Sequence, residues 1–374
     1  MSTEFKPLFA SFTFPVSNIT LRNRIVMAPM TTWSGNDDGT VSDQELAYYC
    51  KRSEGVGMII TACAYIMPQG KGFKGQIGVH ADEMIPHLKQ LADTIHKGGA
   101  KAVLQIYHGG RQSPPDVLPD HQPVSASNIP TVLPNASTPR SLTHDEIIET
   151  IHAFGHATRR AIAAGFDGVE IHGANTYLVQ QFFSPHSNRR DDHWGGSLEK
   201  RLNFPIAVAT EVINTIKYHA TSPFIAGYRL SPEEMEEPGI TIDDTFVLID
   251  KLAALKLDYL HISTMNFWGG SLRDTEDLRS RTQLIEQHLS NAIPIIGVGN
   301  IQTPSDALKI VNTGIPLIAL GREILMEPNW VEKIETGKTE TIHTTLKLSN
   351  QQQLVIPDIM WHGLVTRKGW LQVE

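Results

Sequence analysis

Three polar side chains with complementary chemistry stand close together near the middle of the chain. His172, Asn175 and Tyr177 follow a short strand-like run, Val169–Ile171. An imidazole N–H and an amide N–H can together hold one carbonyl oxygen, and a nearby phenol can deliver a proton. Hydrogen bonding to loop backbone is the alternative use of such groups. The spacing favours a site for a polarised carbonyl compound, because His172 and Asn175 can point to one spot from a turn.

Eight short apolar runs alternate with helical patterns along the chain. The runs are Ile25–Ala28, Gly57–Thr61, Lys101–Ile106, Val169–Ile171, Phe224–Tyr228, Tyr259–Ile262, Pro294–Val298 and Leu317–Leu320. Helix starts are indicated by capping boxes at Ser42/Glu45 and Thr143/Glu146, and by Thr303-Pro304. This alternation predicts an α/β fold of the (β/α)8 TIM-barrel type. A doubly wound open sheet is disfavoured because no GxGxxG follows the first run.

Two additions to the barrel are expected. Phe12–Phe14 and Ile19–Leu21 predict an N-terminal hairpin around a turn. Residues 112–142 are rich in proline and predict a long surface loop after strand 3. Composition does not change across this loop, so residues 1–374 are expected to form a single domain. The last helix of the barrel is expected at about Asn329–Ile334.

Polar groups and glycines recur where the predicted strands end, which is where barrel enzymes place their chemistry. These are Pro29–Trp33, Cys63, Gln105, His108–Arg111, Arg229, Gly297–Asn300 and Gly321-Arg322. Gly297–Asn300 and Gly321-Arg322 predict a phosphate-binding site made of backbone N–H groups and an arginine. The alternative is that the glycines only form tight turns and the arginine is solvated. Arg229 must face either the barrel mouth, where it could neutralise an electron-rich ring, or a buried acid; both readings stay open.

Composition excludes several classes of protein. The net charge of −8 without basic blocks argues against nucleic acid as a partner. No apolar run approaches the ~18 residues of a membrane span, and MSTEFKPLFA has no pattern of an export signal. The two cysteines, Cys50 and Cys63, form no metal pattern, so no metal site is expected. A cytoplasmic location is expected, with both thiols serving as packing groups.

Nearly the whole chain resembles the Old Yellow Enzyme family of FMN-dependent NAD(P)H oxidoreductases. The similarity runs from NRIVMAPMTT at Asn23 to LGREILMEPNW, which ends at Trp330. Its most specific parts are HGANTYLVQQFFSPHSNRRDDHWGGSLEKR from His172 and the pairing of VGNIQ with LGRE.

The resemblance implies a role for each matched position. His172 and Asn175 would bind the substrate oxygen, with His172 also touching the cofactor, and Tyr177 would donate the proton. Flavin-ring contacts would come from Pro29, Met30, Thr31, Cys63, Gln105 and Arg229. Phosphate contacts would come from Gly299, Asn300, Gly321 and Arg322. Trp33 and Tyr107 would be the aromatic residues around the substrate.

The implied activity is that of an ene-reductase with non-covalently bound FMN and NADH or NADPH as reductant. Its small-molecule substrates would be activated alkenes such as α,β-unsaturated carbonyl compounds, with quinones and nitro compounds as further candidates. A reductase of dienoyl thioesters or steroid-type enones is the related alternative, and a non-catalytic flavin-binding protein is the other. Thr31 stands where one branch of the family has cysteine, whereas the run at His108 resembles that same branch. Because the sequence mixes features of different branches, the oligomeric state of neither branch can be transferred to it. Whether the protein is a monomer or a homo-oligomer therefore stays undecided.

Overall fold

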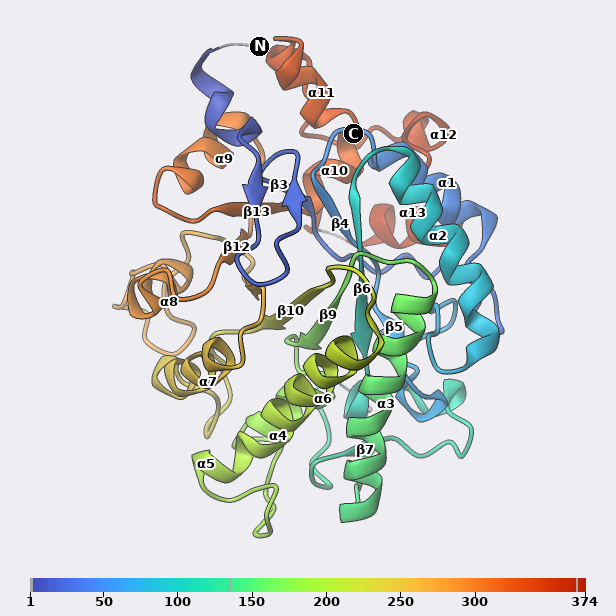
Figure 1. Ribbon diagram of the computed structural model, residues 1–374, viewed down its shortest axis with the longest axis vertical. Helices are drawn as coiled ribbons and strands as arrows, with labels where there is room; N and C mark the ends of the chain where they lie inside the picture. Colours follow the sequence, from blue (N-terminus) through green and yellow to red (C-terminus); the bar gives the residue numbers. More distant parts are fainter. Residues whose placement is uncertain (1–2, 133, 135, 368) are drawn as a thin grey trace.

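A closed ring of parallel strands forms the centre of the computed structural model, which describes residues 3–132, 134, 136–367 and 369–374 (Figure 1). The strands are β3 (Ile25–Met27), β4 (Met58–Ile60), β6 (Lys101–Tyr107), β9 (Gly168–Gly173), β10 (Ile225–Leu230), β11 (Tyr259–Ile262), β12 (Ile295–Val298) and β13 (Leu317–Leu320). They pair in the order β4-β3-β13-β12-β11-β10-β9-β6, and the pairing of β4 with β6 closes the ring. The predicted TIM barrel is therefore confirmed.

Helices surround the ring and cover its outer surface (Figure 1). Those that follow the strands in turn are α1 (Asp43–Arg52), α2 (Ile85–Lys97), α3 (His144–Ala163), α6 (Asn203–His219), α7 (Ile242–Ala254), α8 (Arg281–Leu289), α9 (Pro304–Val311) and α11 (Trp330–Glu335). Shorter elements that the sequence patterns did not indicate are β5 (Ala64–Tyr65), α4 (Leu178–Phe183), α10 (Arg322–Met326), α12 (Gln351–Leu354) and α13 (Asp358–Thr366). The short helix α5 (Leu198–Arg201) begins where the sequence predicts a helix from about Ser197. Several of these short elements lie at the ends of strands, where the sequence places its polar groups.

The two predicted capping boxes differ in the structure. Thr143 and Glu146 bond reciprocally at the start of α3, as predicted. At the start of α1, the Ser42 hydroxyl accepts the Glu45 backbone N–H, but the Glu45 carboxylate instead accepts a hydrogen bond from the Thr32 hydroxyl. The capping-box prediction is thus wrong for the second half of this motif. Glu45 ties α1 to the segment that follows β3.

The predicted N-terminal hairpin is present as β1 (Phe12–Thr13) paired antiparallel with β2 (Thr20–Leu21). Its turn is fastened to the barrel by the Ser17 backbone N–H, which donates to Asp258 immediately before β11 (2.8 Å). Phe14 is fully buried, and its ring centroid lies 5.8 Å from that of Tyr259 inside the barrel. The hairpin therefore closes the end of the barrel where the strands begin, and the opposite end remains open for chemistry.

The proline-rich segment after β6 is more than a surface loop. Two short strands, β7 (Val124–Ser125) and β8 (Arg140–Ser141), pair with each other, and Val124 and Ala126 are fully buried. The prediction of a wholly superficial loop is corrected accordingly, because these apolar side chains anchor the segment in the core. Leu133 and Asn135, which belong to the same predicted loop, lie outside the described residues.

The C-terminal tail lies beside the open end of the barrel rather than at its base. Its backbone pairs at Leu346 and Val373, and Trp361 and Trp370 pack partly buried against the core. Trp370 also lines the large cavity described below. The tail therefore forms part of the wall of that cavity, a position that the sequence patterns did not indicate.

One glycine inside the barrel makes room for a neighbouring ring. Gly227 on β10 is in register with Glu170 on β9 and with Tyr259 on β11. A β-carbon on Gly227 would lie 2.1 Å from Cζ of Tyr259. The missing side chain therefore lets the Tyr259 ring lie across β10 toward Glu170.

We predict that Gly227→Ala is destabilised by about 1–3 kcal/mol, because the added methyl group overpacks a rigid interior. The control is Gly363→Ala in α13, where the nearest atom to the new β-carbon would be 3.6 Å away. The control should be neutral or more stable by up to ~1 kcal/mol, since alanine is the better helix former. Thermal unfolding of both variants without added cofactor checks this; equal midpoints for the two would contradict it.

Candidate active site

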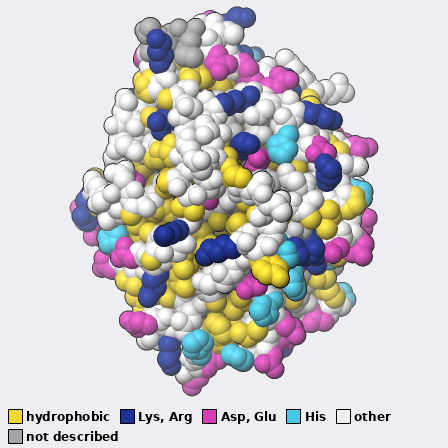
Figure 2. Space-filling view, viewed as in Figure 1, with side chains coloured by type: hydrophobic (Ala, Val, Ile, Leu, Met, Phe, Trp, Pro, Cys, Tyr) yellow, Lys and Arg dark blue, Asp and Glu magenta, His cyan; other side chains and the backbone are white. Residues whose placement is uncertain are grey.

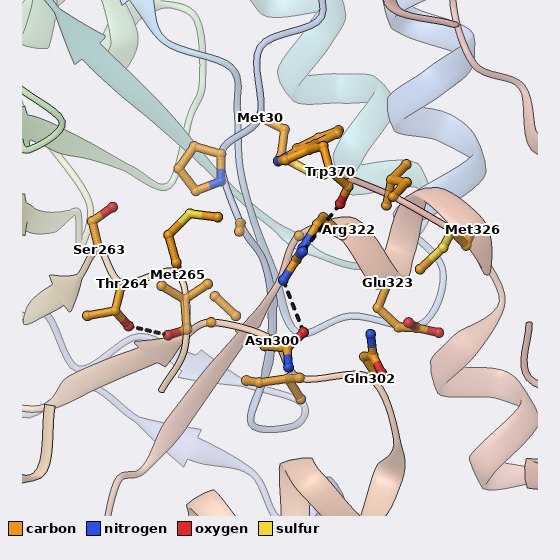
Figure 3. Close-up of a pocket in the computed structure, with 18 of the residues that line it drawn as sticks. Met30, Ser263, Thr264, Met265, Asn300, Gln302, Arg322, Glu323, Met326 and Trp370 are labelled. Carbon is orange, nitrogen blue, oxygen red and sulfur yellow. Dashed lines mark hydrogen bonds between the residues drawn. The ribbon is translucent and has the colours of Figure 1, made fainter. Parts of the chain in front are cut away.

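Two adjoining cavities open at the carboxyl ends of the strands. The larger measures about 690 Å³ and extends from the barrel centre to the C-terminal tail (Figure 3). The smaller, which we call the recess, measures about 80 Å³. Both are lined by Pro29, Met30, Asn175 and Arg229, so the two spaces are continuous. The recess is also lined by Thr31, Cys63, Gln105, His172 and Tyr177.

His172 presents a fixed hydrogen-bond donor to the recess. Its Nδ1 accepts the backbone N–H of Ala174 (3.3 Å), so a neutral ring must carry its proton on Nε2. Burial, together with the nearby Arg229 charge, lowers the pKa of His172 to about 3. The imidazole is therefore neutral at physiological pH, with Nε2–H available to a ligand.

Asn175 is held by two serines that come from neighbouring strand ends. Its backbone adopts the left-handed conformation (φ 56°), which asparagine tolerates better than most residues. Its N–H donates to Ser231 Oγ (2.9 Å), and its side-chain Oδ1 accepts from Ser263 Oγ (2.9 Å). The Ser263 bond orients the amide and leaves its Nδ2 hydrogens for a ligand in the cavity.

Tyr177 sits at the start of α4 with its ring packed against two others. The ring centroids of Tyr107 and His172 lie 4.5 Å and 4.9 Å from its own, both in edge-on contact. Burial raises the pKa of Tyr177 to about 12. The phenol therefore keeps its proton at neutral pH and can act as a donor beside His172.

Arg229 faces the cavity, which is the first of the two alternatives that the sequence left open. It lines both cavities, and its Nε has no hydrogen-bond partner among the described residues. Burial lowers the pKa of its guanidinium, and the Glu170 carboxylate is the strongest opposing influence. Within the described part of the chain, no ion pair joins Arg229 to a carboxylate. A buried, unpaired cation of this kind calls for an electron-rich ligand.

The far end of the large cavity carries the predicted phosphate residues. Arg322 at the start of α10 donates to Asn300 Oδ1 (3.1 Å) and to the Trp370 backbone oxygen (3.3 Å), as Figure 3 shows. Gly299 has φ 126°, and a β-carbon there would lie 2.7 Å from the backbone nitrogen of Phe267. Gly321 precedes α10 without a side-chain cap, so backbone N–H groups are available at that turn.

Some of the predicted residues lie beside the cavities without lining them. Tyr107 is fully buried behind Tyr177. Trp33 packs edge-on against Phe73, with ring centroids 6.2 Å apart. Their roles around a substrate stay predictions.

The two cysteines differ, and for one of them the sequence expectation is wrong. Cys63 is buried at the recess, and burial raises the pKa of its thiol to about 12, so it is protonated. Cys50 is exposed and therefore does not serve as a packing group.

Other kinds of site were sought over the described residues. No group of His, Cys, Asp and Glu side chains there could hold a metal ion. None of the described helices is long and apolar enough to cross a membrane. Charged side chains of both signs are interspersed over the face in Figure 2.

Comparison with known proteins connects this geometry to a family. Residues 7–341 match the model of the NADH:flavin oxidoreductase / NADH oxidase family. The chain is 47% identical to the probable NADH-dependent flavin oxidoreductase YqiG of Bacillus subtilis, over 99% of both chains. It is 45% identical to the NADH:acrylate oxidoreductase of Vibrio harveyi over 92% of this chain, but spans only 34% of that relative's length.

A solved structure agrees with the sequence relatives. Morphinone reductase in complex with tetrahydroNAD superposes with a TM-score of 0.76 at 28% identity, covering 88% of this chain and 91% of the other. These matches confirm the resemblance drawn from the motifs. The chain is therefore a member of the NADH:flavin oxidoreductase / NADH oxidase family, to which the Old Yellow Enzymes belong, and it is an NADH-dependent flavin oxidoreductase.

Proposed function

We propose that the two cavities bind FMN non-covalently, with the flavin ring at the recess and the phosphate at the far end of the large cavity. The main support is Arg229, a buried guanidinium that faces the recess with its Nε unpaired among the described residues. It would lie at the electron-rich pyrimidine edge of the ring, beside Gln105. Arg322 and the backbone near Gly299, Asn300 and Gly321 would hold the phosphate.

One hydrophobic core runs from Phe5 to Leu364, which supports a single domain.

The proposed reaction is the reduction of an activated C=C bond by NADH. A bound flavin supplies the acceptor for the hydride of NADH and then its donor to the β-carbon of the alkene. His172 Nε2–H and the Asn175 amide bind the carbonyl oxygen and stabilise the negative charge that develops there. Tyr177 protonates the α-carbon, and solvent restores the phenol proton. Each turnover thus consumes one hydride and one proton.

The recess favours this reaction energetically. Its donors are held by packing and by neighbouring hydrogen bonds, so little reorganisation is needed when charge develops. One such donor typically contributes ~3–4 kcal/mol to transition-state stabilisation. The name of the acrylate relative adds support, because acrylate is an α,β-unsaturated acid.

The related alternative is a reductase of bulkier enones or dienoyl thioesters on the same scaffold. A non-catalytic flavin-binding role is disfavoured, because a binding protein has no need of a placed proton donor such as Tyr177.

We predict that Arg322→Ala weakens the binding of FMN at least tenfold but leaves the binding of riboflavin unchanged. The lost guanidinium would contact only the phosphate, and a charge-assisted hydrogen bond contributes about 1.5–3 kcal/mol. Quenching of flavin fluorescence on titration with each ligand measures both affinities. Equal losses for FMN and riboflavin would place Arg322 outside the phosphate site.

The experiment that tests the function is an anaerobic visible spectrum before NADH, after NADH and after 2-cyclohexenone. The flavin band should bleach with NADH and return with the enone. In Tyr177→Phe the bleaching should keep its rate, while the return slows by 10²-fold or more because the proton donor is missing. Wild-type protein that takes up no flavin would contradict the proposal, and a normal return in Tyr177→Phe would contradict the role of the phenol.

We also predict a return of the flavin band whose rate is independent of pH between about 6 and 9. His172, with a pKa of about 3, stays neutral over this range, and Tyr177, with a pKa of about 12, stays protonated. The rate should fall only at higher pH, as the phenol begins to ionise. Stopped-flow measurement with pre-reduced enzyme checks this; a step near pH 6.5 would show that His172 titrates normally.

A further inference from the structure

A carboxylate with no exposed surface lies directly beneath the recess. Glu170 points to the inside of the barrel from β9, whereas its neighbours Val169 and Ile171 pack outward toward the helices. In register with Glu170 are Gln105 on β6 and Gly227 on β10. Glu170 does not line either cavity, and so the reaction proposed above leaves it without a role.

Three donors converge on the two oxygens of Glu170. Gln105 Nε2 donates to Oε1 (2.7 Å). Tyr259 donates its phenol proton to Oε2 (3.0 Å), and His261 Nδ1 lies 3.0 Å from the same oxygen. The Tyr259 ring reaches this position through the space that Gly227 leaves open. Two strands, β6 and β11, thus supply three donors to one buried carboxylate on β9.

The bond to Gln105 has a consequence at the recess. An amide whose Nε2 is bound below must present its Oε1 on the other side, and Gln105 lines the recess. The recess then offers an acceptor at this point, flanked by the donors of Arg229 and His172. A flavin pyrimidine edge carries an N–H between two carbonyl oxygens, which is the complementary pattern.

The charge of Glu170 matters to Arg229 as well. Burial alone would raise the pKa of Glu170, but His261, Arg229 and Gln105 outweigh it, so the pKa is lowered and the group is ionised. Burial lowers the pKa of His261, which therefore donates as a neutral ring. The negative charge thus lies close to the buried guanidinium and offsets part of its field in the recess.

We propose that Glu170 is a positioning residue that fixes the Gln105 amide with its oxygen toward the flavin and moderates the Arg229 charge that the flavin meets. This inference rests on the proposed function, because it assumes that FMN binds at the recess. It predicts two separate effects of Glu170, one of geometry and one of charge. Two substitutions separate them.

Glu170→Gln removes the charge and leaves one acceptor oxygen for three donors, so the Gln105 amide is no longer fixed. We expect the affinity for oxidised FMN to fall about tenfold, the loss of roughly one hydrogen bond. Reduced FMN is anionic and meets a stronger Arg229 field, so its affinity relative to oxidised FMN should rise at least about tenfold. The midpoint potential then shifts to more positive values.

Glu170→Asp keeps the charge and shortens the reach by one methylene group. Its affinity for oxidised FMN should fall, while the ratio of affinities for reduced and oxidised FMN stays within about threefold of wild type. The matched control is Asp167→Asn, which removes a carboxylate that binds His96 and Lys101 just before β9. The control should lower the unfolding temperature without moving the potential.

The affinities are measured by fluorescence titration, the potentials by anaerobic equilibration with a reference dye, and the stability by thermal unfolding of flavin-free protein. The proposal is overturned if Glu170→Gln leaves the potential unchanged, or if Glu170→Asp or Asp167→Asn shifts it equally. If Glu170→Gln does not fold, the test passes to Tyr259→Phe, which removes one donor from the carboxylate. This variant must weaken FMN binding, by less than the tenfold expected for Glu170→Gln. Unchanged binding overturns the proposal. Failure of the wild-type protein to bind FMN would instead contradict the proposed function itself.

Discussion

A positive charge held away from water at the mouth of the barrel constrains the rest of the site. Arg229 stands on β10 between His172 on β9 and His261 on β11, in register with both. Removing a guanidinium from water costs several kcal/mol unless partners replace the lost hydration. Glu170 provides compensation from below, and the cavity leaves the upper side for a ligand. Arg229 therefore belongs to the barrel wall, lines the cavity and carries the charge that a ligand there would meet.

The same charge sets the protonation of its neighbours. It adds to burial in keeping His172 neutral, which leaves a single N–H directed at the recess. Tyr177 and Cys63 are buried strongly enough to remain protonated. The recess therefore presents hydrogen-bond donors and few acceptors. Such a surface suits a reaction in which negative charge develops on an oxygen atom of the substrate.

The fold could be predicted from the sequence because each strand is a short apolar run and many helices begin at a recognisable cap. Once the strands are predicted, the polar residues at their carboxyl ends can be read from the sequence as well. Ser263 directly follows the sixth strand of the barrel. Searching the carboxyl end of every predicted strand for polar residues would therefore have found it, as it found Arg229 at the fifth. Its bond to Asn175, however, depends on two segments that are 88 residues apart in the sequence.

Other features could not be predicted from the sequence for physical reasons. Glu170 lies within an apolar run, and only the register of β6, β9, β10 and β11 reveals its partners. Glu45 has the spacing of a capping box, but a buried hydroxyl on Thr32 competes for its carboxylate. The tail that carries Trp370 has no periodic pattern, so its place at the cavity follows from tertiary contacts alone.

The most direct test of the account is to follow isotopes into the product of an enone. With NADH that carries deuterium at both C4 positions, the product should hold one deuterium at its β-carbon. With unlabelled NADH in D₂O, the β-carbon should hold none. The α-carbon should take its hydrogen from solvent by way of Tyr177. A β-carbon that carries no deuterium from NADH, even when the reduced flavin reacts faster than its N–H exchanges with water, would contradict hydride delivery in this cavity. So would an alkene left unreduced after NADH is consumed without oxygen.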